Sequence, residues 1–291
     1  MSAIRSFLFA PGNHPRRVEK ALTLDADAVI LDLEDACPVA EKVATRPVVV
    51  EALGQPRACR GYVRVNPLST EFGYSDLVAV IRSGLDGIVL PKVESADELK
   101  TADWLIGQLE RENGLAARSI DLMPIVETGR GFRAVDAIAQ AGTRAKRLSF
   151  GAGDFTLDIN LIWSRDEMEL LPYRAAIVLA SRAAGLEPPI DTVWIKLQDK
   201  DGFAASAERV RGLGFGGKLC IYPDQVPVVN RAFSPSPEQI AWAERVIGAF
   251  AEAEAAGSAS IQLDGQFLDY PIVYSAERIL QAADAFGLRS A

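Results

Sequence analysis

The sequence contains a single histidine, His14, and only three cysteines among 291 residues. A zinc site that needs several imidazole ligands therefore cannot come from one chain, and a serine–histidine–acid triad would depend on His14 alone. Cys37, Cys59 and Cys220 lie far apart with no Cys-x-x-Cys pair, a pattern typical of reduced, buried thiols. Catalysis must therefore depend on carboxylates, lysines, arginines or a hard metal ion.

Long apolar runs and clusters of basic residues are also absent. No window approaches 18 uninterrupted apolar residues, and residues 1–15 lack the charged-then-apolar layout of a signal peptide. Acidic residues outnumber basic ones by 39 to 31, which gives a net charge of −8 without a basic patch for nucleic acid or an anionic membrane surface. We therefore expect a cytoplasmic protein that binds neither nucleic acid nor membranes.

Eight short, mostly continuous apolar runs alternate with segments of helical periodicity, as is typical of parallel strands buried on both faces. In a chain of this length, eight strand–helix units predict an α/β fold, the (β/α)8 TIM barrel. A doubly wound open sheet is the alternative, although the dinucleotide glycine fingerprint is missing after the first strand. The expected strands are Ser6–Ala10, Ala28–Leu33, Gly61–Val65, Gly87–Leu90, Leu122–Val126, Arg147–Gly151, Thr192–Leu197 and Lys218–Tyr222. The expected helices include Val18–Leu24, Ala96–Glu112, Phe132–Ala141 and Leu170–Ala184.

The pattern changes after residue 234. A long alanine- and glutamate-rich helix is expected at 235–256, and a final helix at Ser275–Phe286. Between them, Asp264-Gly265 separates two short apolar runs, which predicts a hairpin over 260–268. We therefore predict a (β/α)8 catalytic domain over 1–234 and a C-terminal helical and hairpin lid, or arm, over 235–291.

Acidic residues dominate the predicted carboxyl ends of the strands, where barrel enzymes carry their sites. Asp32, Glu34 and Asp35 follow the second strand, and Glu127 and Asp154 follow the fifth and sixth. Oxygen ligands without imidazole or thiolate suit Mg²⁺ or Mn²⁺. Because adjacent strands bring their ends together, the predicted metal pair is Glu127 and Asp154. The alternative is that each acid only caps the helix that follows it.

Basic side chains on the predicted strands have two interpretations each. Arg64 suits a substrate carboxylate, but it could equally form a structural ion pair with an acid after the second strand. Lys92 and Lys196 could form a Schiff base with a carbonyl substrate, as in a metal-free aldolase, although a salt bridge with Glu94 would also explain Lys92. The glycine-rich residues 213–217 could cradle a phosphate or form a tight entry into the eighth strand.

Motifs spread over nearly the whole chain occur in the order of a known family. They include DAVILDLEDA at 27–36 and GIVLPKVE at 87–94, together with residues 5–13, 63–66, 125–131, 150–155 and 217–223. On these motifs the chain resembles the citrate lyase β-subunit-like family of the HpcH/HpaI aldolase group, which includes malyl-CoA and citramalyl-CoA lyases. The resemblance implies a barrel that binds Mg²⁺ and cleaves or forms a carbon–carbon bond beside a CoA thioester.

The resemblance also implies roles for single residues. Glu127 and Asp154 match the family's metal ligands, and Arg64 matches the arginine that holds the carboxylate of a 2-oxo acid. Asp269, in FLDYP at 267–271, matches an aspartate that reaches from the lid into a neighbouring subunit's site. This implies a homo-oligomer, a trimer or hexamer, that shares its lid between subunits.

Two further features concern the substrate. Arg5 and the loop 13–17 are implied to lie near the thioester and its phosphates. The chain departs from the family pattern at Gly153, where members commonly have Glu, and at Tyr222-Pro223-Asp224-Gln225, where they usually have His-Pro-Ser-Gln. Both departures bear on which substrate is used.

The expected function is a Mg²⁺-dependent carbon–carbon lyase, with Mn²⁺ as the alternative ion. It would split a 3-hydroxyacyl-CoA thioester, such as malyl-CoA or citramalyl-CoA, into an acyl-CoA and a 2-oxo acid. One alternative is a thioesterase of the malyl-CoA type, which would hydrolyse the same substrate. Others are a citrate lyase β subunit acting on a carrier-protein thioester, and a barrel that has lost activity and serves as a binding protein.

Overall fold

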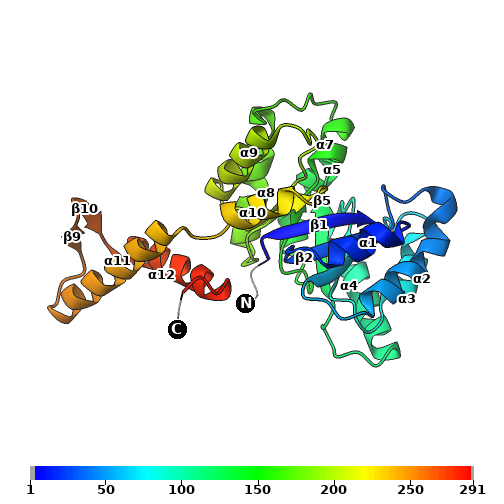
Figure 1. Cartoon of the computed structure of the whole chain (residues 1–291), viewed down its shortest axis with the longest axis horizontal. Helices are drawn as coiled ribbons and strands as arrows, with labels where there is room; N and C mark the ends of the chain where they lie inside the picture. The colour runs from blue at the N-terminus through cyan, green and yellow to red at the C-terminus, as the bar shows by residue number, and fades with distance from the viewer. Residues whose placement is uncertain (1–3, 290–291) are drawn as a thin grey trace. The chain divides into compact units, whose positions relative to one another are not determined.

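Eight parallel strands close into a barrel in the computed structural model of the chain, which describes residues 4–289 (Figure 1). Each strand pairs with the next one in sequence, and the eighth pairs back to the first. This closed order confirms the predicted (β/α)8 barrel and excludes the open sheet. The strands are β1 (Ser6–Pro11), β2 (Ala28–Asp32), β3 (Arg60–Arg64), β4 (Gly87–Leu90), β5 (Asp121–Val126), β6 (Ser149–Phe150), β7 (Ile190–Asp191) and β8 (Gly217–Cys220).

Helices follow the strands and cover the outside of the barrel (Figure 1). The expected helix at 132–141 is instead a pair of short helices joined at Ala134. Among residues 4–289, no helix combines the length and the apolar character needed to cross a membrane. The helices of this part are α1 (Pro15–Leu22), α2 (Lys42–Leu53), α3 (Gly73–Val80), α4 (Ala96–Glu112), α5 (Gly129–Arg133), α6 (Val135–Ala139), α7 (Ala152–Asp158), α8 (Leu171–Ala183), α9 (Lys200–Gly212) and α10 (Gln225–Ala232), with 3₁₀ turns η1 (Val39–Glu41) and η2 (Met168–Leu170).

Apolar side chains fill the interior of the barrel. Phe7 and Tyr62 meet edge to face with ring centroids 5.4 Å apart, and Ile30, Met123 and Ile125 pack into the same cluster. All five side chains are at most 1% exposed. Because this core is closed to solvent, the barrel presents its chemistry at its carboxyl end, as barrel enzymes do.

The seventh strand is the element that the sequence pattern misplaces. We expected a strand at 192–197, but β7 ends at Asp191 and the apolar residues after it form irregular chain. The side chain of Gln225 is inserted beside this segment: its amide donates to Trp194 O at 3.0 Å, and its oxygen accepts from Ile221 N at 2.8 Å. These bonds satisfy main-chain groups that a longer β7–β8 ladder would otherwise pair.

A buried ionic cluster lies against the outer side of β7 and β8. Arg174 on α8 donates to Asp191 at 2.9 Å and to Glu167 at 3.1 Å, and Lys218 on β8 also pairs with Asp191. All four side chains have no exposed surface. Burial raises the pKa of Asp191, but the charges of Lys218 and Arg174 outweigh this and hold the pKa below its ordinary value. Strands β6 and β7 pair at a single position, Ser149 with Ile190. The buried ion pairs therefore help to hold β7 in the wall of the barrel.

Residues 4–230 form one compact unit, and residues 231–289 belong to a second. The second unit contains α11 (Pro237–Ala255), the hairpin strands β9 (Ile261–Leu263) and β10 (Gln266–Leu268), and α12 (Tyr270–Ala285). The predicted hairpin is confirmed, with Asp264 and Gly265 at φ 50° and 79°, the left-handed values of a tight two-residue turn. The last helix begins at Tyr270 instead of Ser275, because Pro271 fits the first helical turn. This unit has its own apolar core, which includes Phe250, Leu268 and Val273.

Candidate active site

A cavity of about 360 Å³ opens at the carboxyl end of the barrel. Its floor is apolar and is formed mainly by Phe9, Ile125, Val193 and Leu219. Its charged lining comes from the ends of four different strands and consists of Asp32, Asp35, Arg64, Glu127 and Asp154. Three of these residues, Arg64, Glu127 and Asp154, are among those that the sequence nominated.

Arg64, the last residue of β3, is the centre of an ion-pair network. Its Nε and Nη2 donate to the two carboxylate oxygens of Asp32 at 2.7 and 2.6 Å, and its Nη1 lies 3.0 Å from Glu34. Burial raises the pKa of Asp32, but Arg64 outweighs this and holds the pKa below its ordinary value. The structure therefore contains the ion pair with acids that follow β2. Because a guanidinium carries five N–H donors, other donors of Arg64 still remain for a substrate carboxylate in the cavity.

Glu127 follows β5 directly and points into the cavity without capping a helix. The cap of α5 is provided by Thr128, whose Oγ1 accepts from Gly131 N at 3.0 Å. Glu127 is 4% exposed, and its Oε1 accepts from the backbone N–H of Lys92 at 2.8 Å. Burial raises the pKa of Glu127 to about 8: the charge of Arg64 lowers the pKa but is outweighed, and the charge of Asp154 acts in the same direction as burial. A buried carboxyl of this kind is stabilised as an anion only when a cation lies beside it.

Asp154 lies in the first turn of α7 and joins a cluster of carboxylates. Oxygen atoms of Glu34, Asp35 and Asp154 all lie within 4.8 Å of one another. Glu34 Oε2 lies 3.0 Å from Arg64 Nη1, and Asp154 Oδ2 lies 3.1 Å from Lys92 Nζ, so both oxygens face cations of the chain. A set of clustered carboxylate oxygens fits Mg²⁺ or Mn²⁺ and does not fit a soft metal. Sequence reasoning noted Glu34 and Asp35 after the second strand but assigned them no role.

The two lysines proposed for Schiff-base chemistry do not have the environment that it requires. Lys92 Nζ lies 2.5 Å from Glu34 and 3.1 Å from Asp154. Burial lowers the pKa of Lys92, but its hydrogen bond to Glu34 and the surrounding acids outweigh this and raise the pKa above its ordinary value. A Schiff-base lysine needs the opposite shift. Lys196 is exposed in the irregular chain after β7, so the metal-free aldolase hypothesis has no support here.

Arg5 and the glycine-rich residues 213–217 lie at the other end of the barrel. Arg5 precedes β1, and its Nε and Nη2 donate to the Asp27 carboxylate at 2.9 and 2.8 Å. Residues 213–217 lead into the amino end of β8, where Gly216 N donates to Pro189 O at 2.9 Å. These positions argue against substrate binding by Arg5 and favour the structural interpretation of the glycines.

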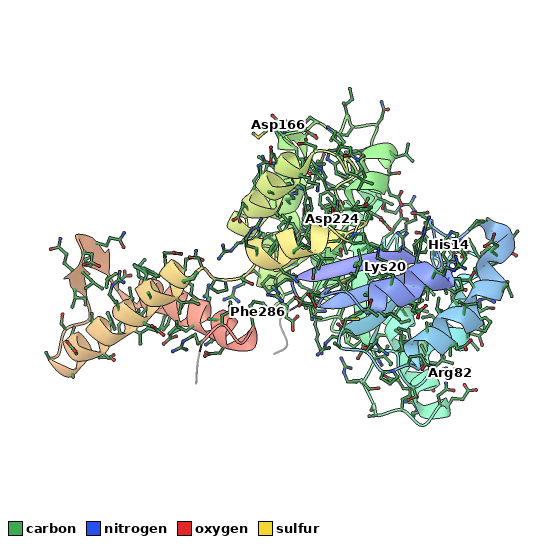
Figure 2. All side chains as sticks on the ribbon, viewed as in Figure 1. His14, Lys20, Arg82, Asp166, Asp224 and Phe286 are labelled. Atoms are coloured by element: carbon green, nitrogen blue, oxygen red, sulfur yellow. The ribbon has the colours of Figure 1, made fainter. Side chains whose placement is uncertain are left out.

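The loop 13–17 follows β1 and therefore lies at the same end as the cavity. His14 precedes α1 and Lys20 lies on that helix, as the labelled side chains show (Figure 2). His14, Arg16 and Arg17 are exposed, and no side chain caps the amino end of α1. The loop thus presents basic side chains at the amino end of a helix, an environment that favours anions.

Asp269 belongs to the second compact unit. It occupies the N-cap position of α12, yet its side chain makes no capping hydrogen bond and is half-buried. Phe267 and Tyr270 on either side are 66% and 39% exposed. The carboxylate is therefore not engaged in helix capping.

Glycine at position 151 makes room for Glu127. A Cβ at Gly151 would overlap the Glu127 carboxylate and lie 2.7 Å from its Cβ, whereas a Cβ at Gly153 would meet nothing within 4 Å. We expect Gly151→Ala to displace the Glu127 carboxylate and to weaken Mg²⁺ binding by about 10- to 100-fold, as misplaced ligands do. Gly153→Ala is the matched control and should stay within about twofold of the wild type. Isothermal titration with Mg²⁺ measures both, and equal affinities for the two variants would contradict the placement of Glu127.

A closed barrel with an arginine and converging carboxylates at its carboxyl end is the arrangement of a (β/α)8 enzyme. The chain belongs to the HpcH/HpaI aldolase/citrate lyase family, whose model matches residues 5–223. The resemblance seen in the sequence is thereby confirmed. The expected class of enzyme, a carbon–carbon lyase of the oxo-acid-lyase type, is confirmed as well.

Relatives in this family carry different activities in their names. The chain is 37% identical to citrate lyase subunit beta of Leuconostoc mesenteroides subsp. cremoris over 97% of this chain and 93% of that protein. It is 32% identical to human mitochondrial citramalyl-CoA lyase, covering 96% and 85%. It is 34% identical to (3S)-malyl-CoA thioesterase of Cereibacter sphaeroides, covering 97% and 95%.

A solved structure of protein CitE from Mycobacterium tuberculosis, in complex with magnesium, acetoacetate and coenzyme A, is similar over almost the whole chain. The TM-score is 0.77 with 30% sequence identity, and the match covers 98% of this chain and 100% of that one.

Proposed function

We propose that the protein is a divalent-metal-dependent lyase that cleaves a 3-hydroxyacyl-CoA thioester, such as malyl-CoA or citramalyl-CoA, into an acyl-CoA and a 2-oxo acid. The observation that carries this proposal is the meeting of Glu127, Asp154 and Arg64 at one cavity. The carboxylates suit a cation, and the guanidinium suits the carboxylate of the substrate. The structures of a relative with magnesium and small oxo acids support the same assignment.

Glu127 and Asp154 are the proposed metal ligands, and Glu34 lies close enough to Asp154 to contribute. Mg²⁺ is the proposed ion and Mn²⁺ the alternative, since both prefer oxygen ligands. When bound, the ion would polarise the oxygen at the carbon that becomes the carbonyl of the 2-oxo acid. Glu127 requires this partner most, because its burial disfavours the charged form.

The remaining steps are assigned to residues of the chain. Arg64 hydrogen-bonds the substrate carboxylate and holds the reacting carbons over the apolar floor. The hydroxyl group gives its proton to solvent, the bond between C2 and C3 breaks, and the electron pair of that bond passes into the thioester enolate. Asp269 then gives a proton to C2 of the enolate and regains one from solvent, and it removes the C2 proton in the condensation direction.

The CoA part of the substrate is assigned to the loop 13–17 and the amino end of α1. His14, Arg16 and Arg17 are exposed there, and the positive end of the helix dipole adds a favourable field for phosphate. Arg5 is not included, since it lies at the opposite end of the barrel.

We propose that residues 1–234 form the catalytic domain and that residues 235–291 act as a lid. The lid is proposed to serve a neighbouring subunit of a homo-oligomer, a trimer or hexamer, and to exclude water from the site. Exposed aromatic side chains on the second unit support a protein contact there: Phe267 and Tyr274 are 66% and 52% exposed. The cytoplasm is the proposed location, in keeping with three buried free cysteines.

A thioesterase is the second candidate, because one of the relatives is named (3S)-malyl-CoA thioesterase. The same cavity would then admit water to the thioester carbon. The Gly153 and Tyr222 departures from the family pattern bear on this choice, since Gly153 lines the cavity and Tyr222 follows Ile221, which also lines it. The citrate lyase relatives support a third candidate, in which a carrier protein delivers the acyl thioester.

The test is product analysis with purified protein and malyl-CoA or citramalyl-CoA, with Mg²⁺ and with EDTA. We expect a 2-oxo acid, measured as its phenylhydrazone, to form with Mg²⁺ and to fall below detection with EDTA. Free thiol without oxo acid would identify the thioesterase. Activity only with the corresponding carrier-protein thioester would identify the citrate lyase subunit.

A further inference from the structure

Lys92 contacts both of the proposed metal ligands through two different groups. Its backbone N–H donates to Glu127 Oε1 at 2.8 Å, and its side-chain Nζ lies 3.1 Å from Asp154 Oδ2. The residue follows β4 and has φ 53°, the left-handed region that residues other than glycine rarely adopt. Such a conformation persists only when the surrounding contacts hold it, and here both ends of the residue are held.

The ammonium group of Lys92 lies among the clustered carboxylates. Nζ is 2.5 Å from Glu34 Oε1 and 3.8 Å from Asp35 Oδ1, in addition to its contact with Asp154. These are the three residues whose oxygens gather within 4.8 Å of one another. The position that a cation would take in this cluster is therefore filled by a cation that belongs to the chain.

An ammonium group and a divalent ion cannot both use the same carboxylate oxygens. Mg²⁺ needs ligand oxygens at about 2.0–2.1 Å in an octahedron, whereas the ammonium already lies against Glu34 Oε1 and Asp154 Oδ2. One third of the Lys92 side chain, 34%, is exposed, and its partners Asp35 and Asp154 line the cavity. The side chain thus has space into which it can withdraw.

We propose that Lys92 is a tethered cation that competes with the divalent ion for Glu34 and Asp154 and so sets the affinity of the site for metal. This inference rests on the metal centre described under the proposed function. In the metal-free protein, the ammonium keeps the acidic residues from repelling one another. When the ion binds, Lys92 leaves the cluster, while its backbone N–H continues to hold Glu127. Lys92 is in this sense a positioning residue and not a nucleophile.

The test is the equilibrium affinity for Mg²⁺ of Lys92→Met, measured by isothermal titration without substrate. Removing the competing charge should lower the dissociation constant at least about tenfold, because the affinity of an oxygen site rises with its net negative charge. The metal-free variant should also melt at a lower temperature than the wild type, and Mg²⁺ should raise its Tm by more. Lys196→Met is the matched control, since it removes the same charge from an exposed position after β7 and should leave both measurements unchanged.

Lys92→Gly provides a second variant if the Met variant folds poorly, because glycine adopts a φ of this sign without strain. It should show the same tighter binding. If the wild type binds Mg²⁺ and the variants bind it equally well or more weakly, Lys92 does not compete with the ion. Lys92 would then be a structural support of the ligands. Failure of the wild type and of both variants to bind Mg²⁺ would overturn the metal centre itself, and this inference with it.

Discussion

Replacing Asp154 by Asn should lower kcat/KM by about a thousandfold, because a bound metal ion supplies several kcal/mol of transition-state stabilisation. The substitution keeps the size of the side chain but removes its charge from the carboxylate cluster. Asp154 is 30% exposed at the start of α7, and its carboxylate does not cap that helix, so the fold should be retained. Steady-state assay of oxo-acid release, together with Mg²⁺ titration, measures the effect.

The matched control is Asp136→Asn, which makes the same chemical change at an exposed position in the first turn of α6. It should retain the activity of the wild type. Retention of Mg²⁺ binding and of turnover by Asp154→Asn would instead show that Asp154 serves the structure and not the metal.

Replacing Asp269 by Asn should lower kcat by about 100- to 10,000-fold, the usual contribution of a positioned general acid or base. Asn is as good an N-cap residue as Asp, so α12 should keep its stability. Mg²⁺ affinity should not change, since Asp269 is assigned no part in holding the ion. The combination of lost turnover, normal Tm and normal metal binding separates proton transfer from a structural role.

Asp264→Asn is the control within the same unit. Asp264 occupies the hairpin turn at φ 50°, which Asn adopts readily, and its contact with Arg245 is a long ion pair of 3.6 Å. Full activity is expected for this variant. An equal loss in both variants would show that the second unit responds to any change of charge, and would remove the case for Asp269 as the proton donor.

Mixed oligomers test whether the lid acts on a neighbouring subunit. When the Asp154→Asn and Asp269→Asn chains are co-expressed, random assortment should restore about one quarter of the wild-type sites if each site combines two subunits. A lid that serves its own barrel would restore none, because every chain then carries one defect.

The barrel was readable from the sequence because its strands are buried on both faces and therefore appear as continuous apolar runs. The bounds of β4 and α4 match the expected residues, and α4 begins where Ser95 accepts a hydrogen bond from Glu98 N at 3.1 Å. The Asp264-Gly265 pair predicted the hairpin for an equally local reason. A tight two-residue turn needs two adjacent residues with left-handed φ, and Asp-Gly adopts this conformation readily. Local chemistry thus determines these elements.

The misplaced seventh strand has a cause that is distant in sequence. The run at 192–197 has the composition of a strand, but Gln225, about thirty residues later, provides hydrogen bonds that allow the chain to leave the wall. The prediction that Arg5 lies near the substrate has no support in the structure, for a different reason. Its place in a family motif suggested proximity to the substrate, whereas its position before β1 puts it at the amino end of the barrel.

The sequence predicted which residues lie at the candidate site better than it predicted the contacts between them. Glu127, Asp154 and Arg64 follow or end clear strands, so the topology alone brings them to one end. The contact of Lys92 with Glu34 and Asp154 depends on a left-handed backbone conformation that no helix or strand propensity foretells. The sequence instead suggested that Glu94 would hold this lysine.

The ionic cluster behind β7 and β8 limits how this region of the sequence can change over generations. Arg174 and Lys218 balance Asp191 and Glu167, and all four are fully buried. Loss of one member leaves a buried opposite charge without a partner, which costs about 3–5 kcal/mol. That cost is a large part of the free energy of unfolding of an ordinary domain. A lineage that alters one of these positions must therefore acquire a compensating substitution at another almost at once. Drift in this part of the wall proceeds through paired substitutions, while the exposed faces of the surrounding helices vary one residue at a time.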